Sequence, residues 1–151
     1  MRAVVQRVAK SLVTVDSKIV GSISRGLLIF LGVAKQDTEK DLNYIVKKII
    51  HARIFQDDNK KMNLSVLDIK GEILVISQFT LFANVSKGNR PSFNDAAEPE
   101  TAEILYNRCI ETFSKFVHTE KGIFGEMMNI EIVNTGPVTI LYDSKKNHKL
   151  I

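Results

Sequence analysis

Two short polar segments, far apart in the sequence, hold the side chains best able to take part in chemistry. The first is SQFTL at 77–81, which follows the apolar run 73–76, and the second is NTGPVT at 134–139. A sheet fixes the backbone at the end of a buried strand while the next loop stays accessible, so polar groups there can converge on a substrate. The Gly-Pro pair of the second segment can expose backbone carbonyls in an unusual geometry. We therefore take both segments as the candidate site.

Each segment also has an ordinary structural explanation. Ser77 and Thr80 could bond to nearby backbone groups, as serine and threonine often do. The Gly-Pro pair could form a turn with a trans peptide bond, because only about 5–6% of X–Pro bonds in folded proteins are cis. If strand alternation persists, Ser77 and Phe79 share one face of the sheet, whereas a break after Gln78 would let the polar groups converge. The residue types alone leave both interpretations open.

Other catalytic groups are scarce in this chain. It contains no phosphate-binding or dinucleotide-binding glycine pattern and no nucleophile elbow. His51, His118 and His148 have no neighbouring ligand at metal spacing, so we expect neither a metal nor a cofactor. Cys109 lies in the apolar stripe of an expected helix, where a small buried side chain is favoured over a nucleophile.

The residue patterns around the two segments predict a mixed α/β fold. Strand patterns cover 4–8, 12–15, 19–23, 26–33, 72–82, 127–133 and 138–142. One amphipathic helix follows Thr38, which forms a capping-box pattern with Asp41, and a second begins near Pro99. Because strands and helices do not alternate strictly, we expect mostly antiparallel pairing. Both helices could cover one sheet face, and the opposite face would need another sheet or another subunit.

Composition is that of an ordinary globular protein. The chain has 151 residues, 44% of them hydrophobic, and a formal net charge of +4. We expect one domain over 1–151, with 144–151 as a flexible tail. No apolar run is long enough to cross a membrane, and the single cysteine favours a reducing compartment, so a cytoplasmic protein is expected. The positive charge is compatible with a polyanionic partner.

Together the two segments resemble the signature motifs of the D-aminoacyl-tRNA deacylases. The likeness extends over nearly the whole chain and includes MRAVVQRV at 1–8, KMNLSV at 61–66 and KGNRPSF at 87–93. One departure is Thr135, where the family usually has an aspartate. This position precedes the Gly-Pro pair and tunes the turn, so the change leaves the rest of the motif intact.

The resemblance implies a homodimer with two active sites at the subunit interface. The substrate would be the ester that joins a D-amino acid, or glycine, to the 3′-terminal adenosine of tRNA, with further contacts to the acceptor stem. The catalytic candidates from one subunit are Ser77, Gln78, Phe79 and Thr80. The candidates for chiral selection, from the other subunit, are Gly136 and Pro137 in cis, Asn134, and Arg7, which helps to orient the motif. Carbonyls of the Gly-Pro pair would exclude an L side chain and let a D side chain point outward.

Thr80 is the candidate side-chain nucleophile, but it has no obvious base, and unactivated hydroxyls are weak nucleophiles. We therefore favour a mechanism in which Thr80 and Ser77 position groups and the ribose 2′-hydroxyl of the substrate activates water. Backbone N–H groups near Phe79 and Thr80 could bind the developing oxyanion.

Two competing hypotheses use the same fold. The first is a nucleic-acid-binding module without catalysis, in which Lys87, Arg90 and the basic tail 145–149 would hold phosphates as they would in the enzyme. The second is a dimeric structural protein with polar turns at both motifs. It leaves the joint occurrence of the motifs unexplained.

Overall fold

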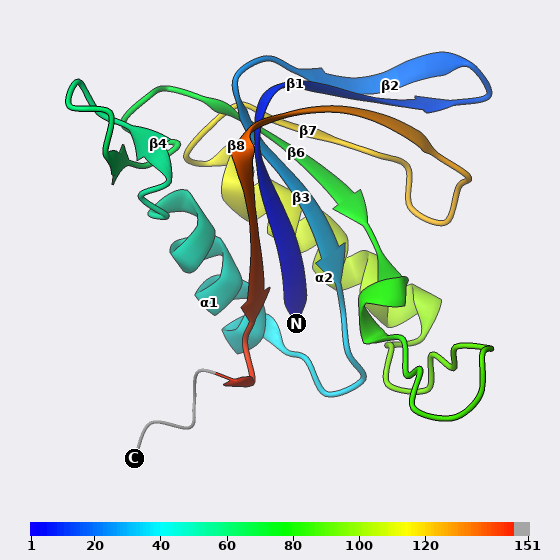
Figure 1. The fold of residues 1–151 in the computed structure, drawn as a ribbon. Coiled ribbons are helices and arrows are strands. Elements are labelled where there is room, and N and C mark those ends of the chain that lie inside the picture. Colours follow the sequence, from blue (N-terminus) through cyan, green and yellow to red (C-terminus); the bar gives the residue numbers. More distant parts are fainter. Residues whose placement is uncertain (147–151) are drawn as a thin grey trace.

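The computed structural model describes residues 1–146 and shows one sheet with both α-helices on the same face (Figure 1). The elements are β1 (Arg2–Val15), β2 (Lys18–Ile23), β3 (Gly26–Gly32), α1 (Glu39–Ile50), β4 (Phe55–Gln56), β5 (Met62–Leu64), β6 (Glu72–Ser77), the 3₁₀ helix η1 (Phe79–Phe82), α2 (Pro99–Ser114), β7 (Thr119–Lys121) and β8 (Asn129–Asp143). The capping box expected at the start of α1 is present.

The main sheet is mixed, and most of its pairings are antiparallel, as predicted. Its order is β2-β1-β3-β6-β7, and β8 pairs with β1. The strand β1 is antiparallel to β2, β3 and β8, whereas β3 and β6 are parallel, as are β6 and β7. The strands β4 and β5 form a separate hairpin. The long strand β1 therefore connects the other parts of the sheet.

The structure adds the short strands β4, β5 and β7, which the sequence did not predict, and it changes the boundaries of several expected strands. The strands expected at 4–8 and 12–15 form the single strand β1, and those expected at 127–133 and 138–142 form the single strand β8. The strand expected over 72–82 ends at Ser77 and gives way to η1. β1 and β8 stay continuous because they pair with each other along most of their length, and this pairing overrides the local polar residues.

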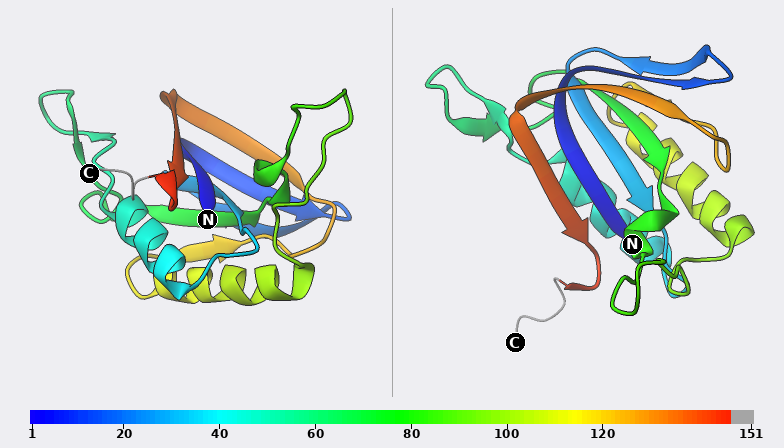
Figure 2. Two further views of the ribbon diagram at one scale, coloured as in Figure 1. Left: turned by 90° about the horizontal axis from the view of Figure 1, so that it is seen from below. Right: turned by 45° about the vertical axis from the view of Figure 1, so that its right-hand side comes forward.

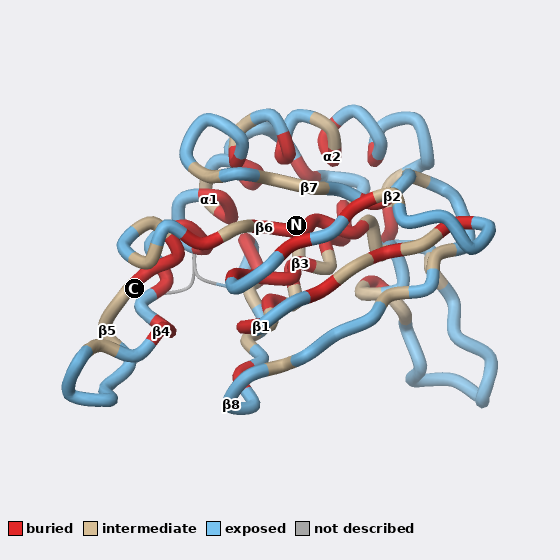
Figure 3. Tube along the Cα trace, turned by 90° about the horizontal axis from the view of Figure 1, so that it is seen from above, coloured by how far each residue is buried: buried red, intermediate tan, exposed pale blue. Residues whose placement is uncertain are grey.

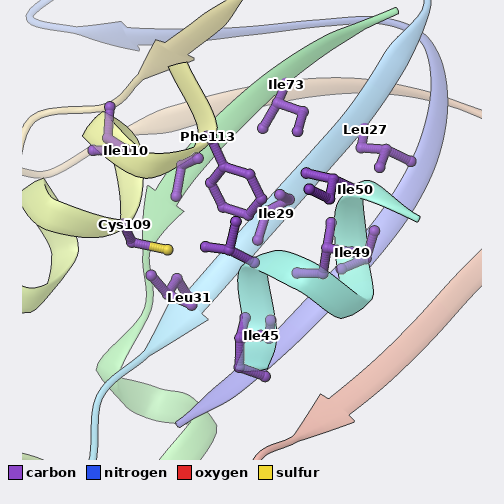
Figure 4. Packing of buried hydrophobic residues seen from close by; sticks show 14 of the residues in the cluster. Leu27, Ile29, Leu31, Ile45, Ile49, Ile50, Ile73, Cys109, Ile110 and Phe113 are labelled. Carbon is purple, nitrogen blue, oxygen red and sulfur yellow. The ribbon is translucent and has the colours of Figure 1, made fainter. Parts of the chain in front are cut away.

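The main hydrophobic core lies between the helices and the sheet. Leu27, Ile29 and Leu31 of β3 pack against Ile45 of α1 and Phe113 of α2 (Figure 4). Alternate residues of β3 and β6 point to the other face, where a smaller cluster includes Leu28, Leu74 and Ile76. Strands β1 and β2 contribute to that second cluster, and the start of β8 packs against it. The part of the sheet formed by β1, β2 and the start of β8 thus curls over part of the face that the helices leave open (Figure 2).

A buried polar network joins the two ends of the described chain. The Met1 amino group donates to Asp37 Oδ1 at 2.6 Å and to Ser144 Oγ at 2.8 Å. Ser144 Oγ donates to Asp41 Oδ1 at 2.8 Å, and Lys145 Nζ lies 2.8 Å from the same oxygen. Ser144 is fully buried. For residues 144 and 145 the structure therefore differs from the expected flexible tail, and 147–151 lie outside the described residues.

We expect Asp41→Asn to reduce stability by about 2 kcal/mol at pH 7 and by less in acid. Burial would raise the pKa of Asp41, but hydrogen bonds from Lys145, Ser144 and Thr38 outweigh it and hold the pKa well below its usual range. A lowered native pKa stabilises the fold above the unfolded pKa of about 3.9, and this contribution is lost as the pH falls toward the native pKa. Thermal unfolding of both proteins between pH 7 and pH 2 measures the difference.

The matched control is Asp58→Asn, because Asp58 is an exposed carboxylate in the turn between β4 and β5. It should unfold like the wild type at every pH. A gap between wild type and Asp41→Asn that stayed constant from pH 7 to pH 2 would contradict the stabilising role of the carboxylate.

Candidate functional site

The first candidate segment forms a sharp turn at the end of β6. The Gln78 backbone N–H donates to Leu31 O of β3 at 2.8 Å, and the chain then enters η1. The side chain of Phe79 is 57% exposed as a result, and Thr80 is exposed beside it. The Gln78 Nε2 group donates to Thr80 Oγ1 at 2.5 Å. The strand β6 therefore ends at Ser77, and this break lets the polar groups of the segment converge.

The turn leaves two backbone donors free of helical acceptors. Phe79 and Thr80 are the first two residues of η1, and the first N–H groups of a helix have no acceptor within the helix. Leu81, the third residue, donates to Gln78 O at 3.3 Å. Hydroxyl, amide and N–H groups thus lie together within four residues. Such a set can position a carbonyl and stabilise negative charge on its oxygen.

A largely apolar groove of about 730 Å³ lies beside this turn. Ser77, Gln78 and Phe79 line it together with residues of β3, α2 and the segments 93–99 and 124–130. The ring of Phe79 meets that of Phe93 edge to face at 5.0 Å between centroids. Such a groove can hold an organic ligand while the polar groups of the turn orient it.

The second candidate segment is a bulge in the middle of β8. Val8 of β1 pairs with Asn134, and Gln6 pairs with Thr139, so residues 135–138 lie opposite Arg7 alone. The Gly136-Pro137 peptide bond is cis, and Gly136 has a φ of +135°. The extra residues therefore form a loop that leaves the ladder and returns to it.

The Asn134 side chain closes this bulge. Its Oδ1 accepts from the Val138 N–H at 2.8 Å, and its Nδ2 donates to Val138 O at 3.1 Å and to Thr139 Oγ1 at 3.3 Å. These bonds join the two ends of the loop. Asn134 thus holds the Gly-Pro pair in shape from within the loop.

The buried side chain of Arg7 supports the bulge from β1. Its Nε donates to Thr135 O at 2.9 Å and its Nη1 to Ile54 O at 2.5 Å. Arg7 is only 7% exposed and lines a small cavity of about 200 Å³ with Thr135 and Arg25. The guanidinium therefore orients the carbonyl that precedes Gly136.

Within one chain the two candidate segments do not meet. Strand β3 relates the positions of the two segments. Its Leu31 pairs with Ser77 of the first segment, and its Leu27 pairs with Arg7, the residue that lies opposite the bulge. Four residues along a strand correspond to about 13 Å. The bend of β8 and the turn after β6 accordingly lie at different ends of the sheet (Figure 1). Most of β8 is exposed (Figure 3).

Sequence reasoning missed one residue that contacts the first segment. Arg2 donates from Nη1 to Leu81 O at 2.9 Å and from Nε to Asp143 Oδ2 at 3.0 Å. Its guanidinium carbon lies 4.6 Å from the centroid of the Phe82 ring. Arg2 thus ties η1 to the end of β8. No local pattern could have revealed contacts across 79 and 141 residues of sequence.

Two other reactive groups of the described residues, Cys109 and His118, belong to neither segment. Burial raises the pKa of the Cys109 thiol to about 12, so the thiolate is unavailable at neutral pH. His118 Nε2 lies 3.0 Å from Glu120 Oε1 after the end of α2. Within 1–146, no three His, Cys, Asp or Glu side chains are placed to hold a metal ion. The helices of that part are also too short or too polar to span a membrane.

The chain is similar to one group of proteins over nearly its whole length. Residues 4–143 match the profile of the family described as D-Tyr-tRNA(Tyr) deacylase. The chain is 57% identical over 146 residues to a D-aminoacyl-tRNA deacylase of Sulfurihydrogenibium sp. (strain YO3AOP1), which covers 97% of this chain and 99% of that protein. It is 56% identical over 147 residues to a D-aminoacyl-tRNA deacylase of Aquifex aeolicus (strain VF5), with the same coverage of 97% and 99%.

The fold is also similar to solved structures. One is described as c-Myc DNA Unwinding Element Binding Protein, with a TM-score of 0.90 and 42% identity over 95% of this chain and 98% of that chain. Another is described as a probable eukaryotic D-amino acid tRNA deacylase, with a TM-score of 0.80 over 93% of this chain and 97% of that chain. At 18% identity, the second likeness concerns the fold alone.

Proposed function

Because the chain belongs to the D-Tyr-tRNA(Tyr) deacylase family, we propose that it hydrolyses the ester bond of D-aminoacyl-tRNA and releases a D-amino acid and tRNA. The family consists of hydrolases, so the chain is an enzyme. The observation that carries the proposal is the turn at 77–80, which places hydroxyl, amide and backbone N–H groups beside an apolar groove. The activity would serve the quality control of translation in the cytoplasm.

The proposed enzyme is a homodimer in which the Gly-Pro bulge of one subunit reaches the groove of the other. Two observations support this arrangement. The bulge and the turn lie about 13 Å apart along β3 within one chain. In addition, β8 pairs only with β1 among the described strands and exposes Ile132, Val133 and Leu141 by 39%, 44% and 60%. Sedimentation equilibrium would measure the stoichiometry.

The proposed chiral filter consists of backbone rather than side chains. Carbonyls of Gly136 and its neighbours would face the α-carbon of the substrate, so handedness would decide which ester fits. A filter that ignores the side chain would accept many D-amino acids and reject the L forms by steric exclusion. Glycine has no side chain to exclude and would also be hydrolysed.

The proposed chemistry uses water and the substrate's own ribose. Water adds to the ester carbonyl carbon and gives a proton to the 2′-hydroxyl, which passes its own proton to the 3′-oxygen. The bond between the carbonyl carbon and the 3′-oxygen breaks, which leaves the free D-amino acid and a 3′-hydroxyl. The N–H groups of Phe79 and Thr80 would stabilise the oxyanion, an effect worth about 10²–10³ in rate. The partner of Thr80 is the Gln78 amide, which is not a base in either orientation. This contact supports a positioning role for Thr80.

We expect Thr80→Val to lower kcat about tenfold without abolishing turnover, because the variant loses one positioning hydrogen bond and no nucleophile. A tRNA ending in 2′-deoxyadenosine should lose far more activity with the wild-type enzyme. Single-turnover deacylation measures both rates. Thr101→Val, on the exposed side of α2, is the matched control. Complete loss with Thr80→Val, at unchanged tRNA affinity, would assign the hydroxyl a direct chemical role.

We expect Arg2→Met to lower kcat about tenfold while the protein stays folded, because η1 would lose its link to the end of β8. The control is Arg108→Met, because Arg108 forms an exposed ion pair with Glu39 and does not contact η1. Steady-state kinetics and thermal unfolding of both variants test the difference. Equal kcat values for the two variants would remove Arg2 from the positioning of the site.

The first test of the function is deacylation of matched D-Tyr-tRNA and L-Tyr-tRNA with a chelator present. Rapid loss of the D ester, with the L ester untouched, would support the enzyme and its chiral filter together. A folded dimer that binds tRNA but turns over neither ester would instead favour a binding module without catalysis.

A further inference from the structure

The loop over residues 84–93, here called the basic loop, stands away from the sheet on the face opposite the helices (Figure 2). Residues 84–92 are all exposed. Gly88 has a φ of +66° with open space around it. The loop carries Lys87 and Arg90, and no acidic residue occurs between 84 and 94. All charged side chains of the basic loop are therefore positive.

Neither cation of the basic loop forms an ion pair with a carboxylate in the described part of the chain. In contrast, Arg2, Arg108 and Lys145 each face a carboxylate. Two unpaired cations on one short loop attract a polyanion more effectively than scattered lysines do.

The basic loop has a fixed shape at its base. Asn84 and Ser92 exchange two backbone hydrogen bonds, at 2.8 and 3.1 Å. Asn84 Oδ1 also accepts from the backbone N–H and the hydroxyl of Ser86, at 2.9 and 2.6 Å. The base then continues into Phe93, which contacts Phe79. The loop is thus attached directly to the candidate catalytic turn.

The distance between the cations and the groove suits the end of an RNA strand. Arg90 precedes Phe93 by three residues, and three residues can span at most about 10 Å. A terminal nucleoside held in the groove would therefore place the phosphates one or two nucleotides upstream near this loop. Lys35 also lines the groove, and its N–H donates to Asp95 O beyond the loop. The groove carboxylates Glu98 and Glu126 belong to other segments, which leaves the loop as the favourable path for phosphates.

We propose that Lys87 and Arg90 bind the phosphodiester backbone of the single-stranded 3′ end of the RNA substrate, just upstream of its terminal nucleoside. The inference rests on the proposed function, since it takes the ester to lie at the turn beside the groove. It makes the basic loop a sequence-independent contact that draws the charged end toward the site and raises its affinity.

The test compares three D-tyrosyl esters: full-length tRNA, a CCA trinucleotide, and adenosine without any phosphate. The variant is Lys87→Ala/Arg90→Ala. The control, Lys40→Ala/Lys47→Ala, removes the same charge from exposed positions of α1. With the loop variant, we expect KM for tRNA at low salt to rise about tenfold at unchanged kcat. The slope of log KM against log salt should become shallower by about 1.4, because each contact to a single strand contributes about 0.7. The control should behave as the wild type.

The adenosine ester separates phosphate binding from a structural role of the loop. The trinucleotide ester should respond to the loop variant, whereas the adenosine ester, which has no phosphate, should not. An unchanged KM for tRNA, or an equal loss on the adenosine ester, would overturn the inference. If the wild type turned over no ester, the proposed function would fail. The basic loop would then be tested by the affinity of the protein for the CCA trinucleotide without an attached amino acid. Equal affinity of the wild type and the loop variant would overturn the inference.

Discussion

Gly136→Ala is expected to lower D-aminoacyl-tRNA turnover by at least about 100-fold and to weaken the discrimination between D and L esters. A Cβ at this position would lie 2.8 Å from Arg7 Nη2 and 2.8 Å from Val138 Cγ2. The φ of +135° is also one that L side chains rarely adopt. Relief of these contacts requires the backbone to shift, and the carbonyls that form the proposed filter would shift with it.

The measurement is the ratio of kcat/KM for D-Tyr-tRNA and L-Tyr-tRNA, together with the unfolding midpoint. Gly88→Ala is the control for backbone strain alone, because Gly88 also has a positive φ but meets nothing within 4 Å. Gly88→Ala should leave the D/L ratio intact. If Gly136→Ala kept both wild-type activity and wild-type rejection of the L ester, the backbone filter would be wrong.

Arg7→Met is expected to reduce both stability and turnover. The change removes charged hydrogen bonds to Thr135 O and Ile54 O inside the protein. Each such bond contributes roughly 1.5–3 kcal/mol, so we expect a loss of about 3 kcal/mol in the free energy of unfolding. The Thr135 carbonyl would also lose its orientation next to the Gly-Pro pair, and we expect the rate to fall about 100-fold.

Urea unfolding and single-turnover kinetics measure these two effects. Arg25→Met is the matched control, because the exposed Arg25 lines the same small cavity but contacts the Phe55 ring, at 5.6 Å, instead of the bulge. The control should change stability by less than about 1 kcal/mol. Arg7→Lys can reach only one of the two carbonyls and should lie between wild type and Arg7→Met. An Arg7→Met protein as stable and active as the wild type would show that the bulge holds its shape without this guanidinium.

Local sequence patterns predicted the elements that frame the site. The helix after Thr38 has its capping box and its buried face at the expected spacing, and α2 begins at Pro99 as expected. The continuously apolar segment predicted as a strand over 26–33 forms β3 (Gly26–Gly32) with both faces buried, and Cys109 lies in the core. These features depend on residues close together in the sequence, so periodicity and capping residues are enough to predict them.

The two motifs, the helices and the central strand could therefore be predicted from local residue patterns alone. Three features could not be predicted in this way: the length of β1 and β8, the bulge of 135–138 opposite Arg7, and the hydrogen bond from Arg2 to Leu81 O. The tertiary structure also buries Ser144, which lies next to Asp143 at the end of β8. All of these features depend on partners that are many residues away in the chain. Strand pairing and buried hydrogen bonds across such separations form only when the whole chain folds, and no local pattern encodes them.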